Sequence, residues 1–423
     1  MDEKSCVIKG KVVDRPWSHR LVLMEYDADS RVQEPKVIIP VRDGEFTYVH
    51  EVDECKMYQL IFADELAKSA YRPIHFFAEP GVVDIEICFE DGGFVPKIHG
   101  GSINGEYQMY LKDKEGRFHF QALSAQYDSL VRQDLYFTPL AKELQQLMFQ
   151  FQEDRLKLDS LNAVYLRLEK EKKVYTAQAM ALNEKNKCLR VQEQKWKEDY
   201  IDRNPSLVSY FLLMDDLRCL MKYRVHGFPG EFDMLSFKDL QRLEDMYYSV
   251  YKLMFPEHSY TSLSAMMLES LRKIEVGGKY IDFTAPDLDG HPVTLSQQID
   301  GKVALIDLWA SWCGPCRKHS KSMIPVYEKY KSKGFTIIGV AREKSVDSAK
   351  NAILQDGYPW LNLVEINDIG NIWFRYCVEG AGGGTFLVDR DGKILAVCPT
   401  AEEVENILEE MLNDEVTSMP GWG

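Results

Sequence analysis

The sequence predicts a multidomain protein that joins an N-terminal antiparallel β-sandwich, a central all-α connector and a C-terminal α/β domain. A chain of 423 residues is too long for a single hydrophobic core. Its pattern of apolar residues also changes twice, from short alternating segments to a helical period, and then to strands alternating with helices. We therefore expect domains at residues 1–117, 118–275 and 276–423.

Short apolar segments separated by turn signals fill the first hundred residues. The strand candidates are CVIKGKVVD, RLVLMEY, KVIIPV, EFTYVHEV, KMYQLIFA, RPIHFFAE and VVDIEICF. Strands of this length, with a hairpin-type turn at Asp43-Gly44, are typical of a small antiparallel sandwich. We expect this domain to bind a ligand whose chemistry the sequence does not define.

Glycine is nearly absent from residues 118–274, where the apolar residues follow a helical period. Apolar positions recur with 4-3 spacing over residues 140–168, interrupted where Asp154 takes an apolar position, which predicts one long amphipathic helix. Thr138-Pro139 is suited to the start of this helix, with threonine as the N-cap. Asn204-Pro205 predicts that a later helix breaks and restarts.

The last third of the chain holds two cysteines at the junction of a strand and a helix. The run VALIDLWA predicts a buried strand, and CRKHSKSMIPVYEKYKSKG predicts a helix that ends at Gly334. Cys313 therefore lies at a helix N-terminus, where unpaired N–H groups and the helix dipole stabilise a thiolate. Cys316 follows one turn later, and Pro315 restrains the turn between them. We expect Cys313 to attack an external disulfide and Cys316 to resolve the mixed disulfide that forms.

A carboxylate also stands inside the predicted buried strand. Asp307 precedes Cys313 by six residues in an otherwise apolar run, where a charge is unfavourable unless it has a function or a partner. We expect Asp307 to lie beneath the cysteines and to move a proton to or from Cys316, through water. The alternative is a surface-facing residue on an edge strand.

Three other interpretations of the cysteine pair are less well supported. Covalent haem attachment needs a histidine directly after the second cysteine, and Arg317 is there. A structural zinc site needs a fourth ligand beside Cys313, Cys316 and His319, and the sequence has no second C-x-x-C. The peroxiredoxin pattern places a hydroxyl residue where this sequence has Ala310. We therefore expect neither a metal nor another cofactor.

The composition of the chain limits the molecules it can bind and its location in the cell. A formal net charge of -15 argues against binding to nucleic acid and to anionic lipid. No run approaches the ~18 apolar residues that a transmembrane helix requires. The start, MDEKSCVIKG, lacks the basic and apolar regions of a signal peptide, so we expect either a cytoplasmic protein or one whose leader has been removed.

Two sets of motifs carry a family resemblance. WASWCGPCRK resembles the active site of thioredoxin-fold proteins, and APDLDGHPVTLSQQIDGKVALIDLWASWCGPCRK with GTFLVDRDGKILAV is similar to the TlpA-like thiol:disulfide oxidoreductases. This resemblance covers about residues 277–412. IKGKVVD, DGEFTY, FFAEPG and HGGSINGEYQMY are similar to a β domain of unknown function that precedes TlpA-like modules in some Gram-negative envelope proteins.

The resemblance implies a thiol:disulfide oxidoreductase of thioredoxin fold in the periplasm or cell envelope. Its substrates would be disulfide-bearing proteins, and its electrons would come from a membrane thiol carrier. By position, Cys313 corresponds to the attacking cysteine, Cys316 to the resolving cysteine and Asp307 to the buried acid. The expected substrate-binding residues are Trp312, Gly314, Pro315, Gly382, Gly383 and Gly384.

The residues between the two cysteines indicate the direction of the reaction. The Cys-Gly-Pro-Cys sequence is that of reducing thioredoxins, with a potential of about -270 mV, so we expect a reductase. The alternatives are an oxidase or isomerase with the same residues, and an envelope binding or scaffold protein with a secondary redox module.

Gly383, in GAGGG, takes the position of the family's cis-proline. We expect a trans peptide there and backbone N–H groups facing the cysteines.

Overall fold

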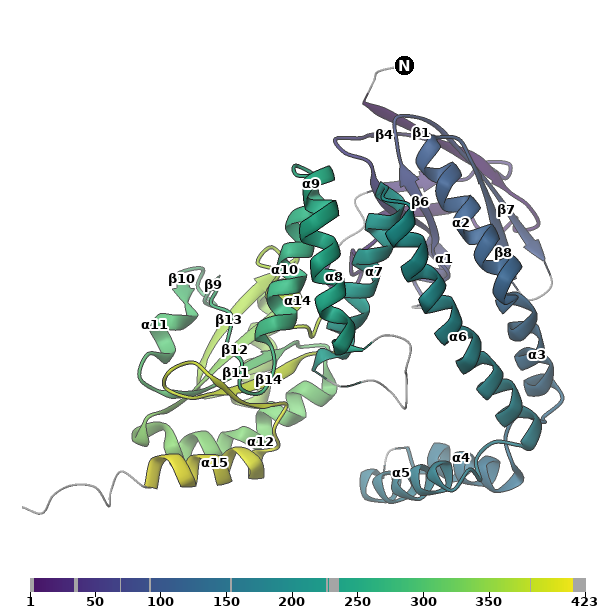
Figure 1. Cartoon of the computed structure of the whole chain (residues 1–423). Coiled ribbons are helices and arrows are strands. Elements are labelled where there is room, and N and C mark those ends of the chain that lie inside the picture. Colours follow the sequence, from purple (N-terminus) through teal and green to yellow (C-terminus); the bar gives the residue numbers. More distant parts are fainter. Residues whose placement is uncertain are drawn as a thin grey trace, which may run out of the picture.

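The N-terminal strands form two four-stranded sheets, in the orders β4-β1-β7-β8 and β3-β2-β5-β6 (Figure 1). The computed structural model describes residues 4–33, 37–68, 70–90, 93–152, 154–225, 227, 236–380 and 382–413. The strands are β1 (Ser5–Val12), β2 (Arg20–Glu25), β3 (Val37–Pro40), β4 (Glu45–Glu51), β5 (Lys56–Phe62), β6 (Ile74–Ala78), β7 (Gly81–Glu90) and β8 (Gly93–His99), with one helical turn, α1 (Ala63–Leu66), after β5.

Alternating apolar residues bury one face of each N-terminal sheet against the other. Cys6 and Ile8 of β1 are buried, and they share a core with Leu23 and Phe76 of the opposite sheet. The prediction that all strands pair antiparallel is wrong in one place, because β1 runs parallel to β7. Alternation specifies which face of a strand is buried, but it does not specify the direction of the neighbouring strand.

Helices follow the last of these strands, beginning at Ser102, which lies before residue 118 where the connector is predicted to start. None of the helices in the described parts of the chain is long and apolar enough to cross a membrane. The helices are α2 (Ser102–Phe118), α3 (Phe120–Arg132), α4 (Pro139–Gln150), α5 (Arg155–Lys170), α6 (Ala177–Arg203), α7 (Leu207–Arg224), η1 (Phe237–Asp239), α8 (Leu240–Met246), η2 (Tyr247–Tyr251), α9 (Lys252–Met254) and α10 (Ser259–Lys273).

The prediction of one long helix over residues 140–168 is wrong, because the chain turns and forms the two helices α4 and α5. Asp154 caps α5, accepting a hydrogen bond from the N–H of Lys157 at 3.3 Å. The predicted cap at Thr138 is confirmed, since its hydroxyl accepts from the N–H of Ala141 at 3.3 Å. The residues buried between the two helices and the adjoining turn are Ala141, Leu144, Leu168 and Val174.

The predicted break at Asn204-Pro205 is confirmed. Helix α6 ends at Arg203, and Ser206 caps α7 by accepting from the N–H of Ser209 at 3.1 Å. Most residues of α7 are buried on all sides of the helix, which is typical of a helix that packs between other layers. Figure 1 shows α7 and α10 between the N-terminal sheets and the C-terminal sheet.

The C-terminal third forms a five-stranded sheet in the order β13-β12-β11-β14-β15. Its central strand, β11, runs parallel to β12 and antiparallel to β14. The elements are β9 (Thr284–Pro286), β10 (Pro292–Thr294), α11 (Leu295–Ile299), β11 (Val303–Trp309), α12 (Gly314–Tyr330), η3 (Lys331–Lys333), β12 (Phe335–Glu343), α13 (Val346–Asp356), β13 (Leu361–Ile366), α14 (Ile372–Arg375), β14 (Gly384–Val388), β15 (Ile394–Val397) and α15 (Ala401–Asn413). This is the thioredoxin-like fold that the sequence predicts.

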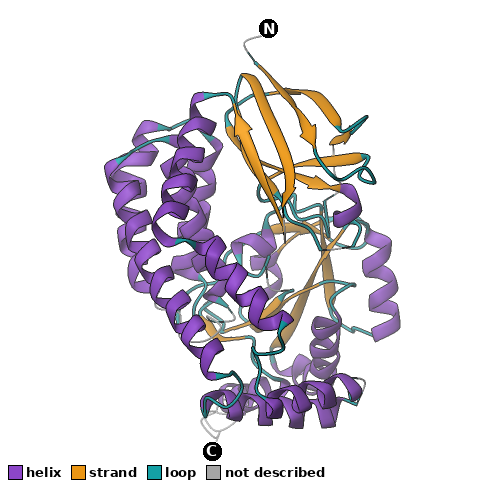
Figure 2. Ribbon diagram, turned by 90° about the vertical axis from the view of Figure 1, so that its right-hand side faces the viewer, coloured by secondary structure: helices purple, strands orange, loops and turns teal. Residues whose placement is uncertain are grey.

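Both faces of β11 are covered, but by different helices. Val303 and Leu305 point into a core with residues of α12 and α15. Ile306 and Leu308 point the other way, into a core that includes α7, α10 and parts of α2, β5 and β6. Figure 2 shows the N-terminal strands stacked above the C-terminal strands, with a group of long helices along one side and further helices on the other side and below. One continuous apolar core therefore links all three predicted segments of the chain.

Candidate active site

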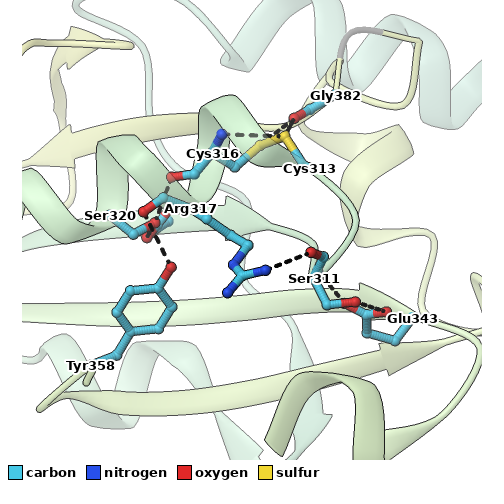
Figure 3. Close-up of a disulfide and its surroundings, with 9 residues drawn as sticks. Ser311, Cys313, Cys316, Arg317, Ser320, Glu343, Tyr358 and Gly382 are labelled. Atoms are coloured by element: carbon cyan, nitrogen blue, oxygen red, sulfur yellow. Dashed lines mark hydrogen bonds between the residues drawn. A yellow bond between two sulfur atoms is a disulfide. The ribbon is translucent and has the colours of Figure 1, made fainter. Parts of the chain in front are cut away.

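The two cysteines lie where β11 ends and α12 begins. All seven residues of β11 are buried, and Cys313 then caps α12, its sulfur accepting from the N–H of Cys316 at 3.3 Å. Pro315 lies in the first turn of the helix, where the missing N–H costs no hydrogen bond. The cysteines are joined in a disulfide, with their Cα atoms 5.4 Å apart (Figure 3). The predicted placement of the pair at a helix N-terminus is confirmed.

Access to the disulfide is narrow. Cys313 is 7% exposed, whereas the preceding Trp312 is 40% exposed. The ring of Trp312 lies 6.0 Å from the ring of the buried Trp373, measured between centroids. An exposed aromatic side chain thus directly precedes the buried Cys313.

The loop before β14 turns a carbonyl group toward the cysteines. The oxygen of Gly382 lies 2.8 Å from the sulfur of Cys313 and also contacts the sulfur of Cys316 (Figure 3). Neither sulfur of a disulfide carries a hydrogen, so this contact becomes a hydrogen bond only after reduction. The expectation that N–H groups face the cysteines is therefore wrong for Gly382. The peptide bond before Gly383 is trans, as expected.

Close packing explains why Gly383 and Gly384 are glycines. Gly383 has φ +106°, and a Cβ there would lie 2.8 Å from the sulfur of Cys316. A Cβ on Gly384 would lie 2.8 Å from the side chain of Val378. The φ of Gly383 also excludes proline, whose ring holds φ near -65°. Glycine is thus required at Gly383, the position that the resemblance to TlpA-like proteins assigns to a cis-proline.

Asp307 lies on the α12 face of the central strand and is 2% exposed. The hydroxyl of Ser320 lies 2.7 Å from its carboxylate and 3.0 Å from the carbonyl oxygen of Cys316, so Asp307 sits beneath the first turns of α12. Burial raises the pKa of Asp307 to about 7, although the hydrogen bond from Ser320 opposes this. The alternative of a surface-facing residue on an edge strand is therefore wrong.

A second buried acid, which the sequence analysis missed, supports the loop before Cys313. Both the N–H and the hydroxyl of Ser311 donate to the carboxylate of Glu343, the hydroxyl at 2.9 Å (Figure 3). Burial raises the pKa of Glu343, and the hydrogen bonds from Ser311 oppose this rise. Arg317 lies on the other side of the loop, 3.4 Å from the carbonyl oxygen of Ser311. Glu343 is the last residue of β12. It reaches the loop before Cys313 because β12 pairs with β11.

The remaining cysteines and the histidine of α12 are separate from this pair. The free cysteines are Cys6, Cys55, Cys88, Cys188, Cys219, Cys377 and Cys398. His319 lies near Thr385, with 3.3 Å between its Nε2 and the hydroxyl oxygen, and burial lowers its pKa. Among the described residues, no group of three or more His, Cys, Asp or Glu side chains is arranged to hold a metal ion.

Comparisons with known proteins agree on the C-terminal third. Residues 276–397 match the AhpC/TSA family. The thiol-disulfide oxidoreductase ResA of Bacillus thuringiensis subsp. konkukian is 33% identical over 140 residues, which cover 33% of this chain and 78% of that protein. The thiol:disulfide interchange protein HelX of Rhodobacter capsulatus is 34% identical over 116 residues, covering 27% and 62%. The thioredoxin domain of a thiol-disulfide oxidoreductase from Bacteroides vulgatus aligns with 31% identity and a TM-score of 0.31, covering 33% of this chain and 100% of that one.

A thioredoxin-like sheet with a Cys-Gly-Pro-Cys disulfide after its central strand defines a thiol-disulfide oxidoreductase. The relationship to ResA extends over most of that protein's length. The chain therefore belongs to the ResA-related, TlpA-like thiol-disulfide oxidoreductases, through its C-terminal third.

Proposed function

We propose that this protein reduces disulfides of other proteins in the cell envelope, with Cys313 as the attacking residue and Cys316 as the resolving residue. The observation that carries this proposal is the position of Cys313 at the N-cap of α12. The N–H groups and the dipole of the helix stabilise a thiolate there. Burial raises the pKa of another cysteine in the same third, Cys377, to about 12, so that thiol is a poor nucleophile.

The reaction moves two electrons from the protein to its substrate in two exchange steps. The thiolate of Cys313 attacks one sulfur of the substrate disulfide, so a mixed disulfide forms and the first substrate thiolate leaves and takes up a proton. Cys316 then gives up its proton, to Asp307 through water, and attacks the sulfur of Cys313. The second substrate thiolate leaves, and the Cys313–Cys316 disulfide remains. A dithiol donor restores the reduced pair.

The carbonyl group of Gly382 affects the reduced pair in two opposite ways. Its oxygen can accept a hydrogen bond from a thiol of the reduced pair but repels a thiolate. Strongly oxidising members of the superfamily owe their potential to a stabilised reduced form. These two effects oppose each other, so the reducing direction rests on the Cys-Gly-Pro-Cys sequence, which is that of reducing thioredoxins.

The groups around the sulfurs suit a polypeptide substrate. We assign substrate binding to the exposed ring of Trp312, the turn residues Gly314 and Pro315, and the loop from Gly382 to Gly384. The envelope location and a membrane thiol carrier as electron donor rest on the TlpA-like resemblance. Fractionation of the native host cells and thiol trapping of the Cys316→Ser variant would test both.

The test of the activity is reduction of insulin with dithiothreitol as donor. Cys313→Ser is expected to be inactive, whereas Cys316→Ser is expected to accumulate a mixed disulfide through Cys313, visible by mass spectrometry. Full activity of the Cys313→Ser variant would show the assignment to be wrong. Redox titration of the wild-type pair separates a reductase, at about -270 mV, from an oxidase, at about -120 mV.

A further inference from the structure

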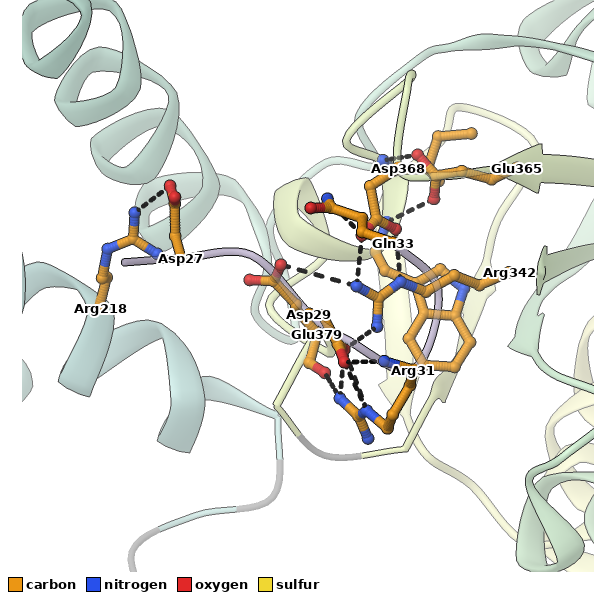
Figure 4. Close-up of polar contacts among 11 residues, drawn as sticks. Asp27, Asp29, Arg31, Gln33, Arg218, Arg342, Glu365, Asp368 and Glu379 are labelled. Carbon is orange, nitrogen blue, oxygen red and sulfur yellow. Dashed lines mark hydrogen bonds and ion pairs between the residues drawn. The ribbon is translucent and has the colours of Figure 1, made fainter. Parts of the chain in front are cut away.

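A loop of the N-terminal β region reaches the rim of the dithiol site. The residues after β2, from Asp27 to Gln33, cross over to the C-terminal sheet (Figure 4). The guanidinium carbon of Arg31 lies 5.0 Å from the centre of the Trp312 ring. Trp312 directly precedes Cys313, so a residue from the N-terminal region borders the site.

Ion pairs hold this loop at several points. Asp29 pairs with Arg342 at 2.8 Å, and Arg342 is fully buried and also binds Asp368 at 2.6 Å. Asp27 pairs with Arg218 of α7 at 2.7 Å, and Figure 4 shows this contact apart from the others. Gln33 donates to Asp368 at 3.2 Å. The loop is thus fixed against both the helices and the thioredoxin-like sheet.

Arg31 also contacts the opposite side of the rim. Its Nη2 donates to the carbonyl oxygen of Glu379 at 2.9 Å. Glu379 stands three residues before Gly382, whose own carbonyl oxygen contacts the cysteine sulfurs. One guanidinium therefore contacts both Trp312, which precedes Cys313, and Glu379, which precedes the glycine loop.

Part of the Arg31 guanidinium remains able to bind a substrate. Its Nε and Nη2 donate to Asp29, but Nη1 has no acceptor among the residues that the structure describes. In Figure 4 this third nitrogen carries no dashed line. The Arg31 side chain is 43% exposed, so an incoming chain can contact it.

We infer that Arg31 is a specificity-determining residue of the dithiol site, and that it selects disulfides carried on an extended polypeptide segment. Its Nη1 donates to a backbone carbonyl group beside the substrate cysteine, while the Trp312 ring contacts a neighbouring side chain. A small disulfide has no such carbonyl group and gains nothing from Arg31. The inference rests on the proposed function, because it names the substrate class of the same site.

The test compares two substrates in the full-length protein: insulin and hydroxyethyl disulfide. Arg31→Ala is expected to lower kcat/KM for insulin about tenfold, because one charge-assisted hydrogen bond to the substrate is lost. We expect this loss to appear mainly as a higher KM. The rate with hydroxyethyl disulfide is expected to change less than about twofold. Gln33→Ala is the matched control, because it removes a bond of the same loop without touching Trp312 or Glu379. We expect it to keep kcat/KM for insulin within about threefold.

The outcomes separate this inference from the proposed function. If the wild-type protein reduces neither substrate, the proposed function fails. If it reduces both, the inference is overturned in any of three cases: when Arg31→Ala is unchanged with insulin or faster, when it slows both substrates equally, and when Gln33→Ala has the same effect. Arg31→Lys keeps the charge but not the fork of donors, and a partial loss with insulin alone supports the inference.

Discussion

Replacing Asp307 by asparagine tests whether this acid serves Cys316. The variant keeps the size of the side chain and a hydrogen bond to Ser320, but it cannot take up a proton at neutral pH. Since the carboxylate lies beneath the first turns of α12, we expect the change to slow resolution of the mixed disulfide more than the first attack by Cys313.

The raised pKa of Asp307 sets the size and the pH dependence of the effect. Burial raises the pKa from its ordinary 3.8 to about 7. To accept the proton of Cys316, Asp307 has to be ionised, which is the case for about half of the molecules at pH 7. The resolution rate of the wild-type protein should therefore rise about tenfold per pH unit below pH 7 and level off above it. In Asp307→Asn the rate should be about 10- to 100-fold lower at pH 7 and should keep rising as Cys316 itself ionises.

The assay is the reaction of the reduced protein with Ellman's reagent in a stopped-flow instrument. With the seven free cysteines replaced by serine, the first release of thionitrobenzoate reports the attack by Cys313, and the second release reports resolution by Cys316. We expect the attack rate to change less than about threefold in Asp307→Asn, so each trace contains its own control. A variant that keeps the break near pH 7, or that slows both steps equally, would refute a proton-transfer role for Asp307.

Two further predictions concern packing around the site. Gly383→Ala is expected to lower the free energy of unfolding by about 1–3 kcal/mol, because its Cβ would press on the sulfur of Cys316 at a φ that favours glycine. Gly314→Ala, where a Cβ meets open space, is the control in thermal denaturation, and equal losses would contradict the packing argument. A fragment from Val276 to the C-terminus is expected to reduce hydroxyethyl disulfide within about tenfold of the full chain, but to melt at a lower temperature, because the fragment exposes its share of the common core. A larger loss of activity in a folded fragment would mean that the preceding residues shape the dithiol site.

The parts of the site that depend on short stretches of sequence were predictable. An apolar strand followed by Cys-Gly-Pro-Cys places Cys313 at a helix N-terminus, because both signals act within a few residues. Asp307 stood out because a carboxylate in a buried strand needs a reason. Glu343 and Arg31 reach the site through strand pairing and through packing of the N-terminal loop, so no local pattern marks them.

The failed predictions have physical reasons of the same kind. The 4-3 spacing over residues 140–168 continues through a turn, because α4 and α5 each bury one apolar face against the other. Asp154, which interrupts the spacing, is the cap of the second helix. In the glycine loop, the absence of proline correctly predicts a trans peptide, but glycine's wide range of φ leaves the direction of the carbonyl groups open.

The α4–α5 pair determines where the molecule opens most easily. Its core is small and separate from the continuous core that runs from the N-terminal sheets to β11. In Figure 1 the two helices lie at the end of α6 that is remote from the N-terminal sheets. Regions with few buried apolar contacts unfold locally at a lower free energy than the rest of a protein. We therefore expect the amide hydrogens of α4 and α5 to exchange with solvent through local opening, while those of β11 and α12 stay protected and the dithiol keeps its geometry.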